Sequence, residues 1–151
     1  MKKLKAFMAT CLTAAALCAL PLQALAKTLL EAGKTDVGVL YIDGDSINTV
    51  KKDGKYYLAF FAEEKYTDAE FLAVLRQGED MQNAAGNISL YLFNTYGSSY
   101  FIGASYVIDA DGNVCADLGA DTKLKAVGNN KTLRNAYTMA LKILERRNRG
   151  W

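Results

Sequence analysis

Runs of apolar residues bounded by turn-forming residues predict six short strands along the chain. The run VGVLYI, Val37–Ile42, is rich in β-branched residues and leads into Asp43-Gly44-Asp45, a pattern typical of a strand that ends in a turn. Asp53-Gly54 separates two further extended runs and predicts a tight hairpin, because glycine accepts the positive φ that such a turn requires. The predicted strands cover residues 37–42, 47–50, 56–62, 88–93, 99–108 and 114–117.

Two other segments show helical periodicity. Thr67 and Glu70 have the spacing of a capping box, which predicts a short helix over residues 67–77. Farther along, apolar residues recur at helical spacing with polar and charged residues opposite them. This pattern predicts a long amphipathic helix that begins at Asn130 or Lys131 and ends near Arg147.

The elements follow the order βββ-α-βββ-α, which predicts one α+β domain. Hairpin-length connections require neighbouring strands to be antiparallel, so we expect an antiparallel sheet of about six strands. The helices must cover an apolar face of that sheet, and the long C-terminal helix is expected to pack against it. Residues 78–87 and 118–130 are expected to be loops.

The first 26 residues form a separate unit. Three lysines among the first five residues precede the apolar run Ala6–Leu20, and small residues lead up to Ala26, which is typical of an export signal cut after that residue. The run of 15 residues is shorter than the roughly 20 that cross a bilayer, so no stable membrane span is expected. We therefore predict a bacterial protein whose mature domain, residues 27–151, is periplasmic or secreted.

Charge, cysteine and histidine content limit the function classes. Without the signal lysines, acidic residues outnumber basic residues by one, so no overall positive charge favours nucleic acid. Cys115 is the single cysteine of the predicted mature domain, which leaves a buried thiol or a bond between subunits as its two interpretations. The chain has no histidine and therefore lacks the commonest general base and zinc ligand. We expect no cofactor and no metal.

Two pairs of aspartates raise the question of a calcium or catalytic site. Asp43 and Asp45 are not followed by oxygen ligands at the alternate positions that a calcium loop needs, and the glycine after Asp109 and Asp111 comes too early. We interpret both pairs as turn residues that bind nearby amides. The alternative is a small periplasmic enzyme that works through the four carboxylates, provided that the fold brings the two turns together.

The strand predicted at residues 56–62 is apolar on both faces. Alternate residues of YYLAFFA point to opposite sides of a sheet, and neither set is plainly polar. One side therefore needs a cover, which a flanking loop, a second copy of the chain in a homodimer or a protein partner would provide. The aromatic residues predicted for such an interaction surface are Tyr56, Tyr57, Phe61, Tyr91, Tyr100 and Tyr106.

Residues 41–47, YIDGDSI, followed by DGKYY at residues 53–57, resemble the opening of bacterial surface-adhesin protein E domains. The later stretches ISLYLF, SYFIGASYVI and DADGNV follow in a similar order, and the likeness spans most of residues 36–147. The resemblance implies an exported, non-catalytic, six-stranded antiparallel sheet with a long helix against it, dimer formation and binding of proteins outside the cell. The early tryptophan, a second cysteine beside Cys115 and the lipid anchor of the best-known member are missing here, and no binding residue is carried over.

These observations favour an exported, non-catalytic binding module whose partner is a protein. The carboxylate enzyme is the first alternative. The second is an inhibitor or chaperone-like module that accepts an added strand along an exposed edge at residues 56–62.

Overall fold

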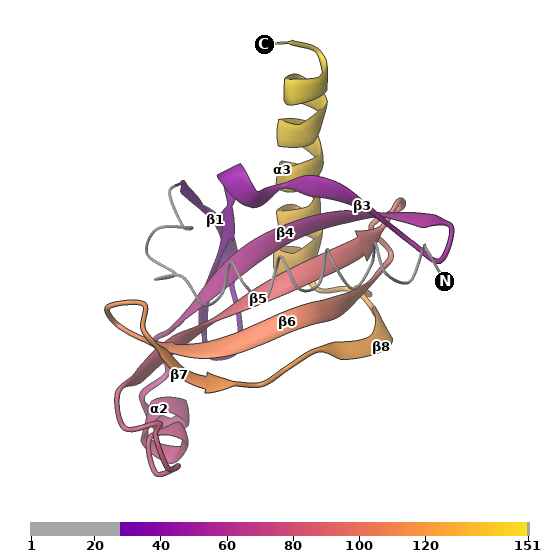
Figure 1. The fold of residues 1–151 in the computed structure, drawn as a ribbon. Helices are drawn as coiled ribbons and strands as arrows, with labels where there is room; N and C mark the ends of the chain where they lie inside the picture. The colour runs from indigo at the N-terminus through magenta and orange to yellow at the C-terminus, as the bar shows by residue number, and fades with distance from the viewer. Residues whose placement is uncertain (1–27, 151) are drawn as a thin grey trace.

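The chain folds into an antiparallel sheet with a long helix against one face (Figure 1). The computed structural model describes residues 28–150. Its elements are β1 (Leu29–Lys34), β2 (Gly38–Asp43), the 3-10 helix η2 (Gly44–Ser46), β3 (Asn48–Lys52), β4 (Lys55–Tyr66), α2 (Ala69–Leu75), β5 (Ala84–Asn94), β6 (Ser99–Asp109), β7 (Val114–Asp117), β8 (Asp121–Ala126) and α3 (Lys131–Asn148). The predicted α+β class, with a C-terminal helix on an antiparallel sheet, is confirmed.

Three long strands, β4, β5 and β6, form the centre of the sheet, and the strands beside them are interrupted. β2 pairs with the C-terminal half of β4, and β3 pairs with its N-terminal half. The interruption is η2, where the carboxylate of Asp43 accepts a hydrogen bond from the amide of Asp45 at 3.0 Å. The hydroxyl of Ser46 donates to the Asp43 carbonyl at 2.8 Å. On the other side, β7 and β8 share β6 in a similar way.

Within residues 28–150 the sheet has eight strands, whereas the sequence predicts about six. β1 was not predicted, and β8 lies in a region that was expected to be a loop. Most side chains of β8 are exposed, so backbone pairing with β6 defines this strand and no apolar run marks it. β5 begins at Ala84, so the loop expected over residues 78–87 is also partly strand.

Capping side chains start both α-helices. Asn130 precedes α3 as predicted, and its side chain accepts a hydrogen bond from the amide of Leu133 at 3.0 Å. The short helix α2 follows Asp68, whose carboxylate accepts from the amide of Phe71 at 2.7 Å. The prediction that Thr67 caps this helix is wrong, because the next residue supplies the oxygen and a negative charge that favours a helix N-terminus.

α3 covers one face of the sheet, which we call the helix face; it carries Phe60 of β4 and Phe93 of β5. These two rings are fully buried and stack with their centroids 5.5 Å apart. Ala136 and Ala140 of α3 are also fully buried, and their small side chains let the helix approach the strands closely. Burial of each aromatic side chain stabilises the fold by about 1.5–3 kcal/mol, so the helix face holds the main core.

Polar contacts fasten α3 at both ends. In its second turn, Asn135 donates to the carbonyl of Ala32 in β1 at 2.7 Å. In its last turn, Arg147 donates to the carbonyl of Ile47 at 3.2 Å and to that of Gly44. An arginine of the basic C-terminal turn therefore ties the helix to the interruption between β2 and β3.

Candidate binding surface

The opposite side of the sheet, which we call the second face, is also apolar. The strand register places Leu92 of β5 between Ala59 of β4 and Phe101 of β6. Ala59 and Leu92 are 4% exposed, and Phe101 is 5% exposed. The second face consists of two clusters, one formed by Ala59, Leu92, Phe101, Val50, Tyr57 and Leu90 and the other by Ile88, Ile108, Phe61 and Tyr106.

No side chain of α2 or α3 belongs to these two clusters. The buried helix residues Leu133, Ala136 and Ala140 all pack in the core of the helix face. α2 has no buried residue. Within residues 28–150, the clusters of the second face are therefore formed by strand residues alone.

At one end of the second face, exposed hydrophobic side chains gather around a shallow depression of about 390 Å³. Tyr56 is 54% exposed, Tyr96 is 87% exposed and Leu124 is 60% exposed. Tyr57 connects the depression to the second face, because its ring packs edge-on against Phe101 with the centroids 5.2 Å apart. We call the depression the aromatic mouth; it is lined by Lys55, Tyr56, Tyr57, Asn94, Thr95, Tyr96, Ser99 and Leu124.

α3 supports the loop that carries Tyr96. The hydroxyl of Tyr137 in α3 donates to the carbonyl of Thr95 at 2.7 Å. Burial raises the pKa of this hydroxyl, so the group remains a hydrogen-bond donor at neutral pH. Gly97 has a φ of 66°, and a Cβ at this position would overlap the Tyr137 ring. The main-chain position of the loop is therefore set by the helix beneath it.

The aromatic residues predicted as an interaction surface lie in three places. Tyr56 and Tyr57 line the aromatic mouth. Phe61 and Tyr106 lie in the second face, where they pack with Ile88. The remaining two, Tyr91 and Tyr100, are on the helix face.

Tyr91 and Tyr100 are part of the aromatic stack beside α3. The ring of Tyr100 lies 5.4 Å from that of Phe93, measured between centroids, and the ring of Tyr91 lies 6.0 Å from it. Burial, with Glu64 nearby, raises the pKa of the Tyr91 hydroxyl. We therefore assign both tyrosines to the core. Strand alternation alone does not say which face the long helix covers.

Tyr96 and Leu124 belong to the aromatic mouth but were not singled out in the sequence. Tyr96 lies in the short turn between β5 and β6. An aromatic residue in such a turn is the only feature of the local sequence that indicates a binding residue. Leu124 lies on β8, a strand that the apolar pattern does not reveal. The sequence alone therefore does not predict that these residues come together in the aromatic mouth.

The two aspartate pairs do not converge. Asp43 ends β2 and Asp109 ends β6, and the intervening β4 and β5 make three strand spacings, about 14 Å. Asp43 bonds the amide of Asp45, and Asp109 accepts from the amides of Asp111 and Asn113, both at 2.9 Å. The predicted turn role is confirmed, and the alternative of one catalytic centre shared by both turns is wrong. No group of three metal-binding side chains occurs within residues 28–150.

β4 is an inner strand. It pairs with β2 and β3 on one side and with β5 on the other. The expectation that residues 56–62 form an exposed edge for strand addition is therefore wrong, because strands pair with this segment on both sides and the amide of Phe61, beside η2, donates to the Ser46 hydroxyl.

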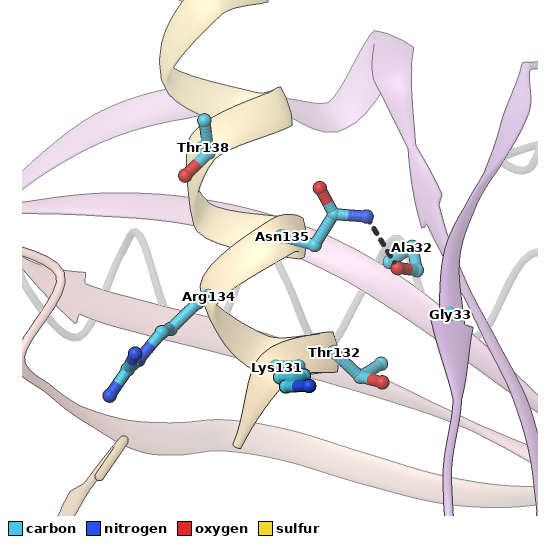
Figure 2. A pocket seen from close by; sticks show the side chains of 7 residues that line it. All are labelled: Ala32, Gly33, Lys131, Thr132, Arg134, Asn135 and Thr138. Atoms are coloured by element: carbon cyan, nitrogen blue, oxygen red, sulfur yellow. Dashed lines mark hydrogen bonds between the residues drawn. The ribbon is translucent and has the colours of Figure 1, made fainter. Parts of the chain in front are cut away.

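A second hollow, of about 500 Å³, lies between β1 and the N-terminal half of α3 (Figure 2). Figure 2 shows the Asn135 amide directed at Ala32, which accepts its hydrogen bond, while Arg134 extends away from β1. Arg134 donates to the carbonyl of Gly128, and Thr132 donates to a carbonyl of β1. Asn135 and Thr132 thus hold the helix against the strand, so we interpret the hollow as a structural seam. Its lining residues are Ala32, Gly33, Lys131, Thr132, Arg134, Asn135 and Thr138.

Cys115 is half-buried on β7 and carries a free thiol. Burial raises the pKa of this thiol, and the nearby charges of Asp109 and Asp80 act in the same direction. These effects disfavour the thiolate, which is the form that a nucleophilic cysteine needs.

Comparison of the chain with protein-family models, curated proteins and solved structures finds no match. The predicted export signal, residues 1–26, lies outside the described residues. Neither helix within residues 28–150 has the length and apolar character needed to span a membrane.

Proposed function

We propose that the protein is an exported, non-catalytic module that binds a protein partner through the aromatic mouth. The observation that carries this proposal is the gathering of Tyr56, Tyr96 and Leu124, all exposed, at one end of an apolar sheet face. Tyrosine is enriched at protein interfaces, because its ring buries a large area while its hydroxyl can still form a hydrogen bond. Contiguous exposed apolar patches mark interaction sites.

The charges around the mouth favour a particular kind of partner. Lys55 lines the mouth, and the ammonium of Lys52 lies 4.6 Å from the centre of the Phe101 ring. Opposite charges across an interface speed association and exclude wrong partners. We therefore propose a partner segment with apolar side chains flanked by carboxylates.

The resemblance of residues 36–147 to surface-adhesin protein E domains supports the same class of function. It also supports a partner in the periplasm or outside the cell. In this proposal the tyrosines of the mouth bind the partner, and the protein does not convert it chemically.

The test compares capture of partners by the exported protein and by variants of the mouth. Tyr96→Ala and Leu124→Ala remove exposed side chains there, so both should leave folding intact. Val74→Ala is the matched control, because Val74 is 69% exposed on α2. α2 contacts the Ala84 end of β5, opposite the mouth.

Each immobilised protein is exposed to envelope and extracellular matrix proteins, and the captured proteins are quantified by mass spectrometry. We expect the wild type and the control to capture the same partner, and each mouth variant to bind it about tenfold or more weakly, which corresponds to about 1.4 kcal/mol. Equal capture by all four proteins would contradict the assignment of the mouth as the binding surface.

A further inference from the structure

The apolar side chains of α2 are not buried within the domain. Phe71, Val74 and Leu75 share one face of this helix, and none of them is buried. Their spacing, i, i+3 and i+4, is that of the anchor residues by which amphipathic helices bind a groove on another protein. The molecule thus presents a short apolar helix that its own sheet does not cover.

Carboxylates lie on both sides of these apolar residues. Arg76, the one basic residue of residues 67–83, donates through Nε to the carbonyl of Ala84 at 3.0 Å. The acidic residues outnumber it, and all are exposed: Asp68, Glu70, Glu79 and Asp80. α2 and its flanks therefore have the two properties proposed above for a partner of the aromatic mouth, apolar side chains and flanking carboxylates.

The aromatic mouth carries the opposite charge. Its lining includes Lys55 and no acidic residue. The ammonium of Lys51 lies 5.3 Å from the centre of the exposed Tyr56 ring, so cations lie beside the aromatic side chains of the mouth. Such complementary charges favour contact between the mouth and α2, and they weaken as salt screens them.

The mouth and α2 lie at opposite ends of β5. Ala84, whose carbonyl is bound from α2, begins this strand, and Asn94, which lines the mouth, ends it. The eleven residues of β5 span about 33 Å. Figure 1 shows α2 beyond the end of the sheet that lies opposite the hairpin of β3 and β4. Only residues 67–68 join α2 to β4, so α2 cannot reach the mouth of its own chain.

We propose that the aromatic mouth of one copy binds α2 of another copy, so that the protein associates with itself through two different surfaces. The proposal rests on the proposed function, because it identifies a second copy of the chain as a partner of the same mouth. A contact between unlike surfaces leaves one mouth and one α2 open at the ends of each assembly. Copies therefore add until the assembly closes into a ring or continues as a filament.

The two surfaces also agree in size and rigidity. A helix of seven residues is about 10 Å long. The mouth, of about 390 Å³, lies at the lower end of the range of ligand-sized pockets and suits a few side chains of such a helix. The Phe71 ring packs edge-on against Tyr66 with the centroids 4.9 Å apart, and the Asp68 carboxylate caps the helix. α2 is thus already held in place, which lowers the entropy lost on binding.

Mixing two variants tests the proposal. Tyr96→Ala alters the mouth and leaves α2 unchanged, whereas Val74→Lys places a cation among the carboxylates of α2 and leaves the mouth unchanged. Both side chains are exposed, so both variants should fold. We expect each variant alone to associate with itself at least tenfold more weakly than the wild type. An equal mixture should form dimers and nothing larger, because one intact mouth and one intact α2 remain in each pair.

Analytical ultracentrifugation over a concentration series, up to about 1 mM, measures the assemblies. Leu118→Lys is the matched control: Leu118 is also exposed and lies near Asp117 and Asp121, but it belongs to neither surface. We expect the control to associate like the wild type, and salt to weaken the association of both. A monomeric wild type, association that neither variant weakens, or a mixture of the two variants that forms no dimer would overturn the proposal.

The capture experiment separates failure of this inference from failure of the proposed function. An immobilised Val74→Ala chain keeps its mouth, so it still captures a partner of the mouth. If the wild type is monomeric but Tyr96→Ala loses a captured protein, only the pairing of the mouth with α2 is wrong. If Tyr96→Ala changes neither self-association nor capture, the proposed function is wrong as well.

Discussion

The two faces of the sheet carry similar apolar side chains, but α3 packs on only one of them. On the helix face, Phe60 and Phe93 stack beneath α3, and the helix is fastened at both ends to the strands. On the second face, Phe101 and Leu92 are equally apolar, but their clusters contain no residue of α2 or α3. This difference shows that apolar alternation identifies the side chains that avoid water. It does not identify which part of the chain, or which partner, covers them.

The strongest test of this difference between the two faces is to remove one phenylalanine side chain from each. Phe93→Ala leaves a cavity in a stack sealed by α3 and should lower the free energy of unfolding by about 3–5 kcal/mol. Phe101→Ala should lower it by less than half as much, because the cluster that contains Phe101 includes no residue of α2 or α3. Urea unfolding followed by circular dichroism measures both. Equal losses would mean that the two faces are sealed alike.

A glycine next to α3 tests how firmly the helix face supports the mouth. Gly97→Ala should lower the free energy of unfolding by about 2–3 kcal/mol, because the positive φ is strained and the new methyl overlaps Tyr137. Gly54→Ala is the control: its φ of 78° carries similar strain, but no atom lies within 4 Å of the added methyl group. Thermal unfolding compares the two. A loss no larger than that of the control would show that Tyr137 does not fix this loop.

Filling space on each face gives a smaller contrast. Ala140→Leu should destabilise the protein by about 1–3 kcal/mol, because the fully buried alanine sets the distance between α3 and the sheet. Ala59→Leu, on the second face, should destabilise the protein less than Ala140→Leu does, because no residue of α2 or α3 packs in its cluster. Chemical denaturation of both variants provides the measurement, and a large loss for Ala59→Leu would indicate a tightly packed second face.

The smallest expected effect concerns the strand interruption to which α3 is tied. Burial raises the pKa of the Asp43 carboxyl, so the folded state holds its proton more tightly than the unfolded state. This contribution to stability is present at low pH and is lost as the pH rises through the raised pKa. Asp43→Asn keeps an oxygen for the amide of Asp45 and should remove this slope, with a change below about 1 kcal/mol at neutral pH.

A carboxyl with the opposite shift serves as the control for that titration. Hydrogen bonds from the side chain and backbone of Asn113 lower the pKa of Asp109, so its contribution is lost as the pH falls. Asp109→Asn should therefore alter only the acidic side of the stability profile. Unfolding measured at a series of pH values distinguishes the two, and a similar profile for both variants would contradict the assigned shifts.

Local chemistry made part of this fold predictable. The hairpin at Asp53-Gly54 forms because both residues adopt positive φ, and α3 begins where Asn130 can bind a free amide. Each of these features depends on a few neighbouring residues. The antiparallel pairing of β5 with β6 follows for the same reason, since only residues 95–98 connect these two strands.

Features that depend on distant residues were not predictable. β8 is held by backbone pairing to β6, so its polar sequence resembles a loop. Tyr91 and Tyr106 occupy neighbouring long strands and look equivalent in sequence, yet one lies in the core beside α3 and the other in the second face. The position of the helix decides between them, and that position is set by contacts across the whole domain.

The interruptions in the outer strands have a consequence for how this protein associates. A long, straight border would offer an unbroken row of amides and carbonyls to any passing chain, which is how sheets fuse into fibres. Here short strands of four to six residues form each border, β1 and β3 on one side and β7 and β8 on the other. Such short strands are poor templates for pairing with further chains. The molecule can therefore carry apolar sheet faces without nucleating aggregation.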